Sequence, residues 1–195
     1  SCFLTDTVVI NDLTVTNPSN LQTCNTGAAS YSFDLTANNE NQLGLNNTTY
    51  DLIYYASMAD IATNNPIAGT TNFSTTSGQT IYVKIYNTIS NSFCDAVYQF
   101  DLVINPVVNA NQPVDVQLCE APTATTYFLA NLDLQVLNGL TGYSVLYFSN
   151  QSDAIAGNTG AITSVAIPNG TTIVTVWIRM QNASNPLCFD VTSVD

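Results

Sequence analysis

Hydrophobic and polar residues alternate with a period of two along several short segments of the chain. Residues 30–35 and 80–86 alternate in this way, and aromatic and β-branched residues dominate them. Clusters of Asn, Gly and Ser separate these segments from their neighbours. The pattern therefore predicts short strands joined by turns.

The second half of the chain repeats the first with a shift of about 94 residues, which is the signature of a tandem repeat. The first copy begins with Leu-Gln-Thr-Cys at Cys24, and the second begins with Val-Gln-Leu-Cys at Cys119. The two copies close with Cys94 and Cys188. Further matched segments are 50–55 with 143–148 and 82–85 with 177–180, and matched single residues are Phe33 with Phe128, Asp60 with Asp153, and Asn87 with Asn182.

The repeat predicts the domain organisation. Residues 1–11 are expected to be the closing strand of a preceding repeat, 12–105 the first repeat and 106–195 the second, so that the chain is a slice of a longer array. A unit of about 94 residues with about seven short strands has the size of an immunoglobulin-type sandwich. We therefore expect an all-β protein made of tandem immunoglobulin-like antiparallel β-sandwiches.

One segment in each copy suggests a helix. Residues 57–62 and 151–156 have helical composition, but they are too short for more than a turn or two. Asp60 and Asp153 occupy the same place in these segments. An acid that recurs in this way is expected to cap the helical turn, and we do not expect it to catalyse a reaction.

Charge excludes several classes of function. The chain has 2 basic and 14 acidic residues and no histidine, which gives a net charge of -12. Two cations cannot form the basic patch that nucleic acids or acidic membranes require. Histidine-based nucleophile systems and zinc sites are also excluded, and no apolar run reaches the roughly 20 residues of a membrane span. The chain is therefore expected to be neither an enzyme nor a membrane-inserted protein.

The five cysteines predict an oxidising, extracellular compartment. One periodic arrangement pairs Cys24 with Cys94 and Cys119 with Cys188, within each copy. The other pairs Cys94 with Cys119 across the joint, mirrored by Cys2 with Cys24. We favour the first, because a closed loop of this length stabilises a single sandwich by about 4 kcal/mol in the chain-entropy model. Five free thiols are the remaining alternative.

The only two cations, Lys84 and Arg179, occupy one repeat position and alternate with Tyr82, Tyr86 and Trp177. On a strand these side chains share one face, opposite Ile81, Val83 and Ile85. One hypothesis makes them a contact stripe for sugars or partners. The favoured alternative has each cation cover an outward strand and pair with a nearby ring or carboxylate.

Acidic residues give little support for a metal or catalytic site. Asp12, Asp101 and Asp115 are the one candidate group for structural calcium, near the joint of the repeats. Other cofactors are not expected. A glycosidase needs two acids that flank a cleft, whereas the acids here are scattered along different predicted elements, namely Asp34, Asp51, Asp60, Asp133 and Asp153.

The order of the motifs resembles a known family. Leu-Gln-x-Cys is followed by Ser-Phe-Asp-Leu-Thr, then by Tyr-Asp-Leu-Ile-Tyr-Tyr-Ala-Ser-Met-Ala-Asp, and finally by a cysteine before Phe-Asp-Leu-Val-Ile-Asn-Pro. In this order the chain is similar to the tandem repeats of giant Flavobacterium-type (Bacteroidota) cell-surface adhesins, such as the SprB-like gliding-motility adhesins exported by type IX secretion.

The resemblance implies a bacterial cell-surface location, an Ig-like sandwich in each repeat and a role in adhesion or gliding. It also implies O-glycosylation at Thr7, within Asp-Thr-Val. The acid-rich, calcium-binding loop of many such repeats is replaced here by 25–29 and 120–124, which hold a single carboxylate between them.

Two functional hypotheses follow. In the first, the repeats form an extended stalk and contact surface of an adhesin, with surfaces or polysaccharides and neighbouring repeats as partners, and the isolated chain is a monomer. In the second, the chain is an accessory carbohydrate-binding module of a secreted polysaccharide-degrading enzyme.

Overall fold

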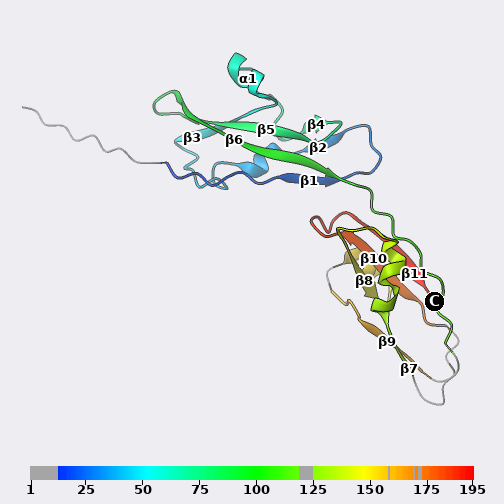
Figure 1. Ribbon diagram of the computed structural model, residues 1–195. Helices are drawn as coiled ribbons and strands as arrows, with labels where there is room; N and C mark the ends of the chain where they lie inside the picture. Colours follow the sequence, from blue (N-terminus) through cyan, green and yellow to red (C-terminus); the bar gives the residue numbers. More distant parts are fainter. Residues whose placement is uncertain (1–12, 119–124, 158, 169, 171–172) are drawn as a thin grey trace, which may run out of the picture. The chain divides into compact units, whose positions relative to one another are not determined.

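The computed structural model describes residues 13–195 apart from 119–124, 158, 169, 171 and 172. Contacts divide the chain into two compact units (Figure 1). Of the described residues, unit 1 contains 13–21 and Ala29–Val103, and unit 2 contains Gln22–Ala28 and those from Ile104 to Asp195. A short segment of the first repeat therefore belongs to the compact unit of the second.

The strands of the first repeat form a four-stranded sheet and a two-stranded sheet. The larger sheet has the order β1-β6-β5-β3, in which β5 pairs antiparallel with both β3 and β6. The smaller sheet pairs β2 with β4, also antiparallel. The strands are β1 Leu21–Cys24, β2 Tyr31–Phe33, β3 Tyr50–Tyr55, β4 Phe73–Thr75, β5 Gln79–Asn87 and β6 Ser92–Asn105.

The second repeat has the same plan. Its larger sheet has the order β11-β10-β8, and its smaller sheet pairs β7 with β9. The strands are β7 Thr125–Phe128, β8 Tyr143–Phe148, β9 Ser164–Ile167, β10 Val176–Asn182 and β11 Phe189–Val194. The predicted all-β sandwich architecture is confirmed, although the described residues hold six strands in the first repeat and five in the second instead of about seven.

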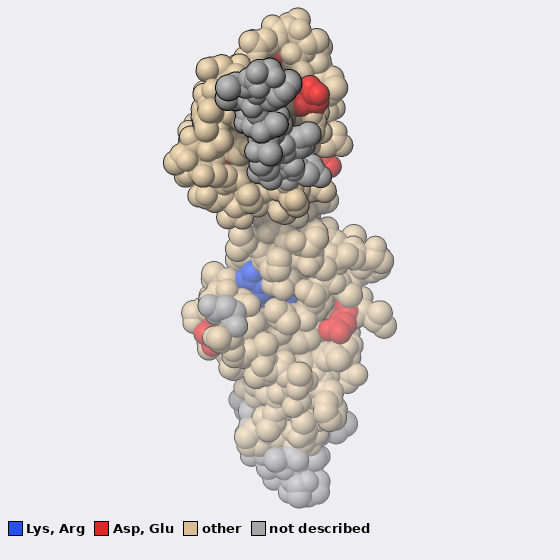
Figure 2. Space-filling model, turned by 90° about the vertical axis from the view of Figure 1, so that its left-hand side faces the viewer, with Lys and Arg blue, Asp and Glu red and all other residues tan. Residues whose placement is uncertain are grey.

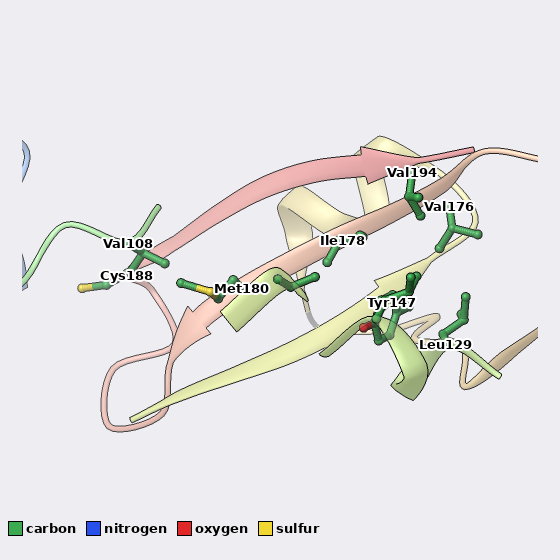
Figure 3. Packing of buried hydrophobic residues seen from close by; sticks show 10 residues of the cluster. Val108, Leu129, Tyr147, Val176, Ile178, Met180, Cys188 and Val194 are labelled. Atoms are coloured by element: carbon green, nitrogen blue, oxygen red, sulfur yellow. The ribbon is translucent and has the colours of Figure 1, made fainter. Parts of the chain in front are cut away.

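The period-two pattern explains the cores. On β5, Ile81, Val83 and Ile85 are completely buried, and the residues between them are only partly buried. On β10, Ile178 and Met180 are buried in the same way. They pack with inward residues of the other strands and helices of unit 2 (Figure 3), among them Leu129, Tyr147, Val176, Cys188 and Val194.

The two predicted helical turns are confirmed, but their N-caps are Ser57 and Asn150 and not the predicted aspartates. α1 covers Met58–Thr63 and α3 covers Gln151–Ala156. The N-cap side chain of Ser57 accepts from the Asp60 N–H at 3.1 Å, and that of Asn150 accepts from the Asp153 N–H at 2.9 Å. Each N-cap side chain also donates to the aspartate of its helix. The recurring acids therefore hold the N-cap side chains from the third position of each helix.

The structure contains three further helical segments that the sequence did not predict. They are the 3-10 helices η1 Leu35–Asn38 and η2 Leu129–Leu132, and the α-helix α2 Asp133–Leu137. The predicted strand at 30–35 ends at Phe33, because the Asp34 carboxylate accepts from the Thr36 N–H at 3.0 Å and starts η1. In the second repeat Leu129, Leu132 and Val136 lie on one helical face and are buried.

Candidate functional site

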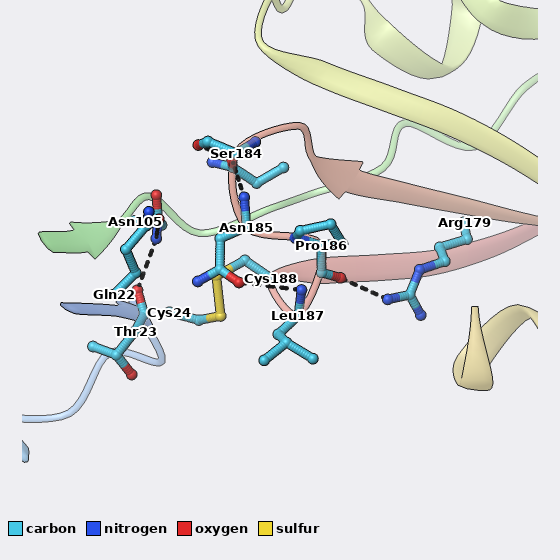
Figure 4. The surroundings of a disulfide bond; sticks show 11 residues. Gln22, Thr23, Cys24, Asn105, Arg179, Ser184, Asn185, Pro186, Leu187 and Cys188 are labelled. Atoms are coloured by element: carbon cyan, nitrogen blue, oxygen red, sulfur yellow. Dashed lines mark hydrogen bonds between the residues drawn. A yellow bond between two sulfur atoms is a disulfide. The ribbon is translucent and has the colours of Figure 1, made fainter. Parts of the chain in front are cut away.

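A disulfide joins Cys24 to Cys188, which are 164 positions apart in the chain (Figure 4). The Cα atoms of the two cysteines are 5.3 Å apart, within the usual range for a disulfide. Cys24 is the last residue of β1, and Cys188 immediately precedes β11. The bond thus connects the opening cysteine of the first repeat to the closing cysteine of the second, inside unit 2.

Asn105 holds the segment around Cys24. Its amide nitrogen donates to the Gln22 side-chain oxygen at 3.1 Å and to the Thr23 carbonyl at 3.2 Å. Its own carbonyl accepts from the Asn25 N–H at 2.8 Å. Asn105 is buried, and a buried amide with its partners in place fixes the backbone that it binds.

A turn built on Asn182 holds Cys188. The Asn182 side-chain oxygen accepts from the N–H groups of Ser184 and Asn185, and the Asn182 N–H donates to the Cys188 carbonyl at 2.9 Å. Asn87 has the same role in the first repeat, where its side-chain oxygen accepts from two backbone N–H groups. The asparagine that recurs three positions after each cation is therefore a turn-forming residue.

Both predicted disulfide arrangements are wrong. Cys24 and Cys188 are bonded to each other, and Cys94 is a free thiol. Cys94 lies near the start of β6, whereas the backbone around Cys24 is bound to Asn105 at the end of that strand. The eleven residue steps from Cys94 to Asn105 span roughly 36 Å along a strand, far beyond the reach of a disulfide. Cys2 and Cys119 lie outside the described residues.

The repeat also permits a third periodic pairing of the cysteines, in which the opening cysteine of one copy pairs with the closing cysteine of the next. The structure has this pairing. The signal that could have revealed it is the position of Asn105, which ends the last strand of the first repeat at the predicted joint. The first strand of a sandwich can pair with its last strand, and this brings Cys24 to the joint.

Arg179 is buried at the centre of a polar cluster next to the disulfide turn. Its guanidinium donates to the carbonyls of Ala154, Ile155 and Pro186 at 2.7–3.0 Å and to the side chain of Gln181 at 2.7 Å. Two of these carbonyls belong to the last turn of α3, where a cation is favourable. Burial lowers the pKa of Arg179 from its ordinary value, yet a guanidinium remains charged in proteins.

Lys84 occupies the matching position in the first repeat and is only partly buried. Its ammonium lies 5.5 Å from the centroid of the Phe93 ring, and the guanidinium carbon of Arg179 lies 3.5 Å from that of Phe189. Each cation thus lies over a local ring, as the favoured interpretation expects, but Arg179 is buried and does not cover an outward strand. The contact stripe needs a correction, because Arg179 is 4% exposed and cannot be a surface contact. The partly buried members of the stripe are Tyr82, Lys84, Tyr86 and Trp177.

The candidate catalytic acids have structural partners. Asp34 caps η1, Asp60 accepts from the Ser57 hydroxyl, and Asp133 accepts from the Tyr147 hydroxyl at 2.6 Å. Burial, the Asp133 hydrogen bond and the Asp133 charge raise the pKa of Tyr147. These contacts place each acid in the scaffold of its own repeat.

The candidate calcium ligands are likewise engaged locally. Asp101 accepts from the Thr80 hydroxyl at 2.8 Å, and Asp115 accepts from the Asp195 N–H at 3.3 Å. No group of three or more metal-ligating side chains occurs among the described residues. Asp12, like Thr7, lies outside them.

One hollow of about 320 Å³ lies at the edge of unit 2, between β7, β9 and the end of β11. Most of the residues that line it are apolar, and its acids, Asp115 and Asp195, hydrogen-bond within the repeat. The exposed face in Figure 2 carries few charged side chains among uncharged ones. No helix in the described part of the chain is long and apolar enough to cross a bilayer.

Comparisons with known structures and curated proteins give limited information. A search of curated proteins finds no match. A solved structure of SGBP-B from the mixed-linkage glucan utilization locus of Bacteroides ovatus, in complex with a mixed-linkage heptasaccharide, is 10% identical. The match covers 91% of the present chain and 42% of that chain, with a TM-score of 0.25. Similarity at this level identifies neither a shared fold nor a shared ligand.

A family model gives a specific result. The model of the Flavobacterium inter-domain disulphide bond domain matches residues 20–108 and again residues 115–195. The two matches follow the two sequence repeats, and the family description agrees with the Cys24–Cys188 bond between them. The chain therefore belongs to the Flavobacterium inter-domain disulphide bond domain family, of which it carries two copies.

Proposed function

We propose that the chain is part of the stalk of a cell-surface adhesin that serves surface attachment or gliding motility. The observation that carries the proposal is the disulfide between the opening cysteine of one repeat and the closing cysteine of the next. Such a bond adds a second covalent link between successive repeats, beside the peptide backbone. This suits a protein that transmits force between a cell and a surface. A disulfide also indicates an oxidising, extracellular location.

The composition supports the same proposal. A net charge of -12 and a surface rich in uncharged polar residues suit an extended, soluble repeat protein. We propose no catalytic activity and no cofactor, and we propose that the isolated chain is a monomer. Export by the type IX system and kinship with SprB-like adhesins belong to this proposal.

A second candidate is a carbohydrate-binding module. It is favoured by the partly buried aromatic residues on the outer face of β5, where Tyr82 and Tyr86 flank Lys84 and the Tyr86 ring lies 5.1 Å from the Phe93 ring. Aromatic side chains with a polar end are common contacts in binding sites.

A binding experiment separates the two candidates. The oxidised chain is applied to an array of soluble oligosaccharides and to polysaccharide-coated surfaces, in parallel with its Tyr82→Ala and Tyr86→Ala variants. The stalk proposal expects no tight binding to any single oligosaccharide. Tight binding that either variant abolishes would instead establish the binding module.

The genomic context gives an independent test. The adhesin proposal expects the complete reading frame to hold further copies of the same repeat and a C-terminal sorting domain. A frame that joins these two copies to a hydrolase domain would contradict the stalk and favour the module.

A further inference from the structure

We propose that the Cys24–Cys188 disulfide diverts tension around the folded interior of both repeats. The bond replaces 164 residue steps of the chain with a Cα distance of 5.3 Å. When the chain is pulled from its two ends, tension passes along the backbone to Cys24, crosses the sulfur atoms and continues from Cys188 to Asp195. Everything between the two cysteines lies outside this path.

The excluded part of the chain contains most of the secondary structure. Strands β2 to β10 and all the helical segments lie between Cys24 and Cys188. Among the described residues, only the strands β1 and β11 lie on the tension path. Force can therefore peel off these two strands, while the other elements are not stretched.

Both anchor points are braced by hydrogen bonds inside one compact unit. Asn105 binds Gln22 and Thr23 beside the first cysteine. The Asn182 turn and the hydrogen bond from Arg179 to the Pro186 carbonyl hold the second cysteine, Cys188. Because Gln22–Ala28 belongs to unit 2, the bond connects parts of one folded body. A bond placed there keeps the tension path short for as long as it remains oxidised.

Single-molecule stretching with handles at the two termini tests the proposal, because the extension depends on which residues a disulfide excludes. At ~3.6 Å per residue, the fully unfolded reduced chain extends to roughly 700 Å. The oxidised chain with the Cys24–Cys188 bond extends to roughly 110 Å, about sixfold less.

Other pairings give other lengths. The two bonds within the copies would give ~200 Å, and the bond across the joint with its mirror would give ~530 Å. Any of these values, or ~700 Å for the oxidised wild type, would overturn the proposal. When reductant is added to the folded, tethered protein, the extension on unfolding should change from ~110 Å to ~700 Å. The protein need not be unfolded and refolded before this measurement.

Variants provide matched controls. Cys24→Ser is expected to extend several-fold further than the wild type without reductant, and Cys188→Ser serves as a second variant. Cys94→Ser removes the free thiol and should keep the short extension. A short extension in Cys24→Ser would show that another bond diverts the tension, and would contradict the proposal.

The biological use of this device rests on the proposed stalk function, but the device itself does not. A chain that keeps the short extension and yet binds an oligosaccharide tightly would refute the stalk alone. A chain that binds nothing and extends fully while oxidised would refute the diversion of tension alone.

Discussion

The guanidinium carbon of Arg179 lies 3.5 Å from the centroid of the Phe189 ring on the neighbouring strand β11. The same side chain donates to three backbone carbonyls from two separate segments, the end of α3 and the disulfide turn. One residue thus connects a helix, a turn and a strand. Its removal would leave several buried acceptors without donors, which is more costly than the loss of one exposed contact.

We expect Arg179→Met to destabilise unit 2 by about 3 kcal/mol, because hydrogen bonds to a charged donor contribute more than neutral ones. Trp177 is the only tryptophan and lies on β10, so its fluorescence reports the unfolding of unit 2 in urea. The matched control is Lys84→Met, whose ammonium has a single ring contact at 5.5 Å. Lys84→Met should lower the free energy of unfolding by less than about 1 kcal/mol. Equal losses in the two variants would contradict the assigned role of Arg179.

Gly157 is expected to be required for the position of that guanidinium. It has a φ of 68°, and a Cβ atom placed on it would lie 2.5 Å from the Arg179 guanidinium carbon. Gly157→Ala therefore combines backbone strain with a steric clash, and we expect a loss of about 2–3 kcal/mol.

Gly139→Ala is the control for Gly157→Ala. Gly139 has a φ of 84°, but a Cβ atom there would meet nothing within 4 Å. Gly139→Ala should therefore lower the free energy of unfolding only by the cost of backbone strain, about 1 kcal/mol. In the Arg179→Met background, the cost of Gly157→Ala should fall towards that of the control. A cost that does not depend on Arg179 would rule out the clash.

Local features of this fold were predictable from the sequence because they depend on neighbouring residues. The alternation around Ile81, Val83 and Ile85 predicted β5 and its buried face, and the composition of 57–62 and 151–156 predicted α1 and α3. In these cases the residues that cause the structure lie within a few positions of each other.

Features that depend on distant contacts were not predictable in this way. Lys84 and Arg179 occupy one repeat position, yet only Arg179 is buried, because α3 and the Pro186 turn supply carbonyls that fit its planar fork. The disulfide likewise depends on which strand ends meet. Cys24 reaches Cys188 because the backbone beside it is bound to Asn105, which is 81 positions further along the chain than Cys24.

The hydrogen bonds of the Asp60 carboxylate in α1 predict a pH dependence of stability. Hydrogen bonds from the side chains of Ser57 and Asn65 lower the pKa of the Asp60 carboxyl. Since the folded pKa lies below the unfolded value of about 3.9, this contribution is present above that pH and is lost as the pH falls through the folded pKa. Asp60→Asn should therefore reduce stability at about pH 6 and lose its effect in strong acid. Urea unfolding at several pH values measures this, and Ser57→Ala should flatten the same slope.

Reduction of the disulfide should destabilise unit 2 in particular, because both sulfur atoms lie within it. In the chain-entropy model, a loop of this length contributes about 5 kcal/mol, and less if the first repeat stays folded inside the loop. We expect the urea midpoint followed by Trp177 fluorescence to fall sharply on reduction, while unit 1, followed by the remaining change in circular dichroism, shifts little. Cys94→Ser should leave both transitions unchanged in the oxidised protein. A Trp177 transition that is indifferent to reductant would show that the bond does not stabilise the unit that contains it.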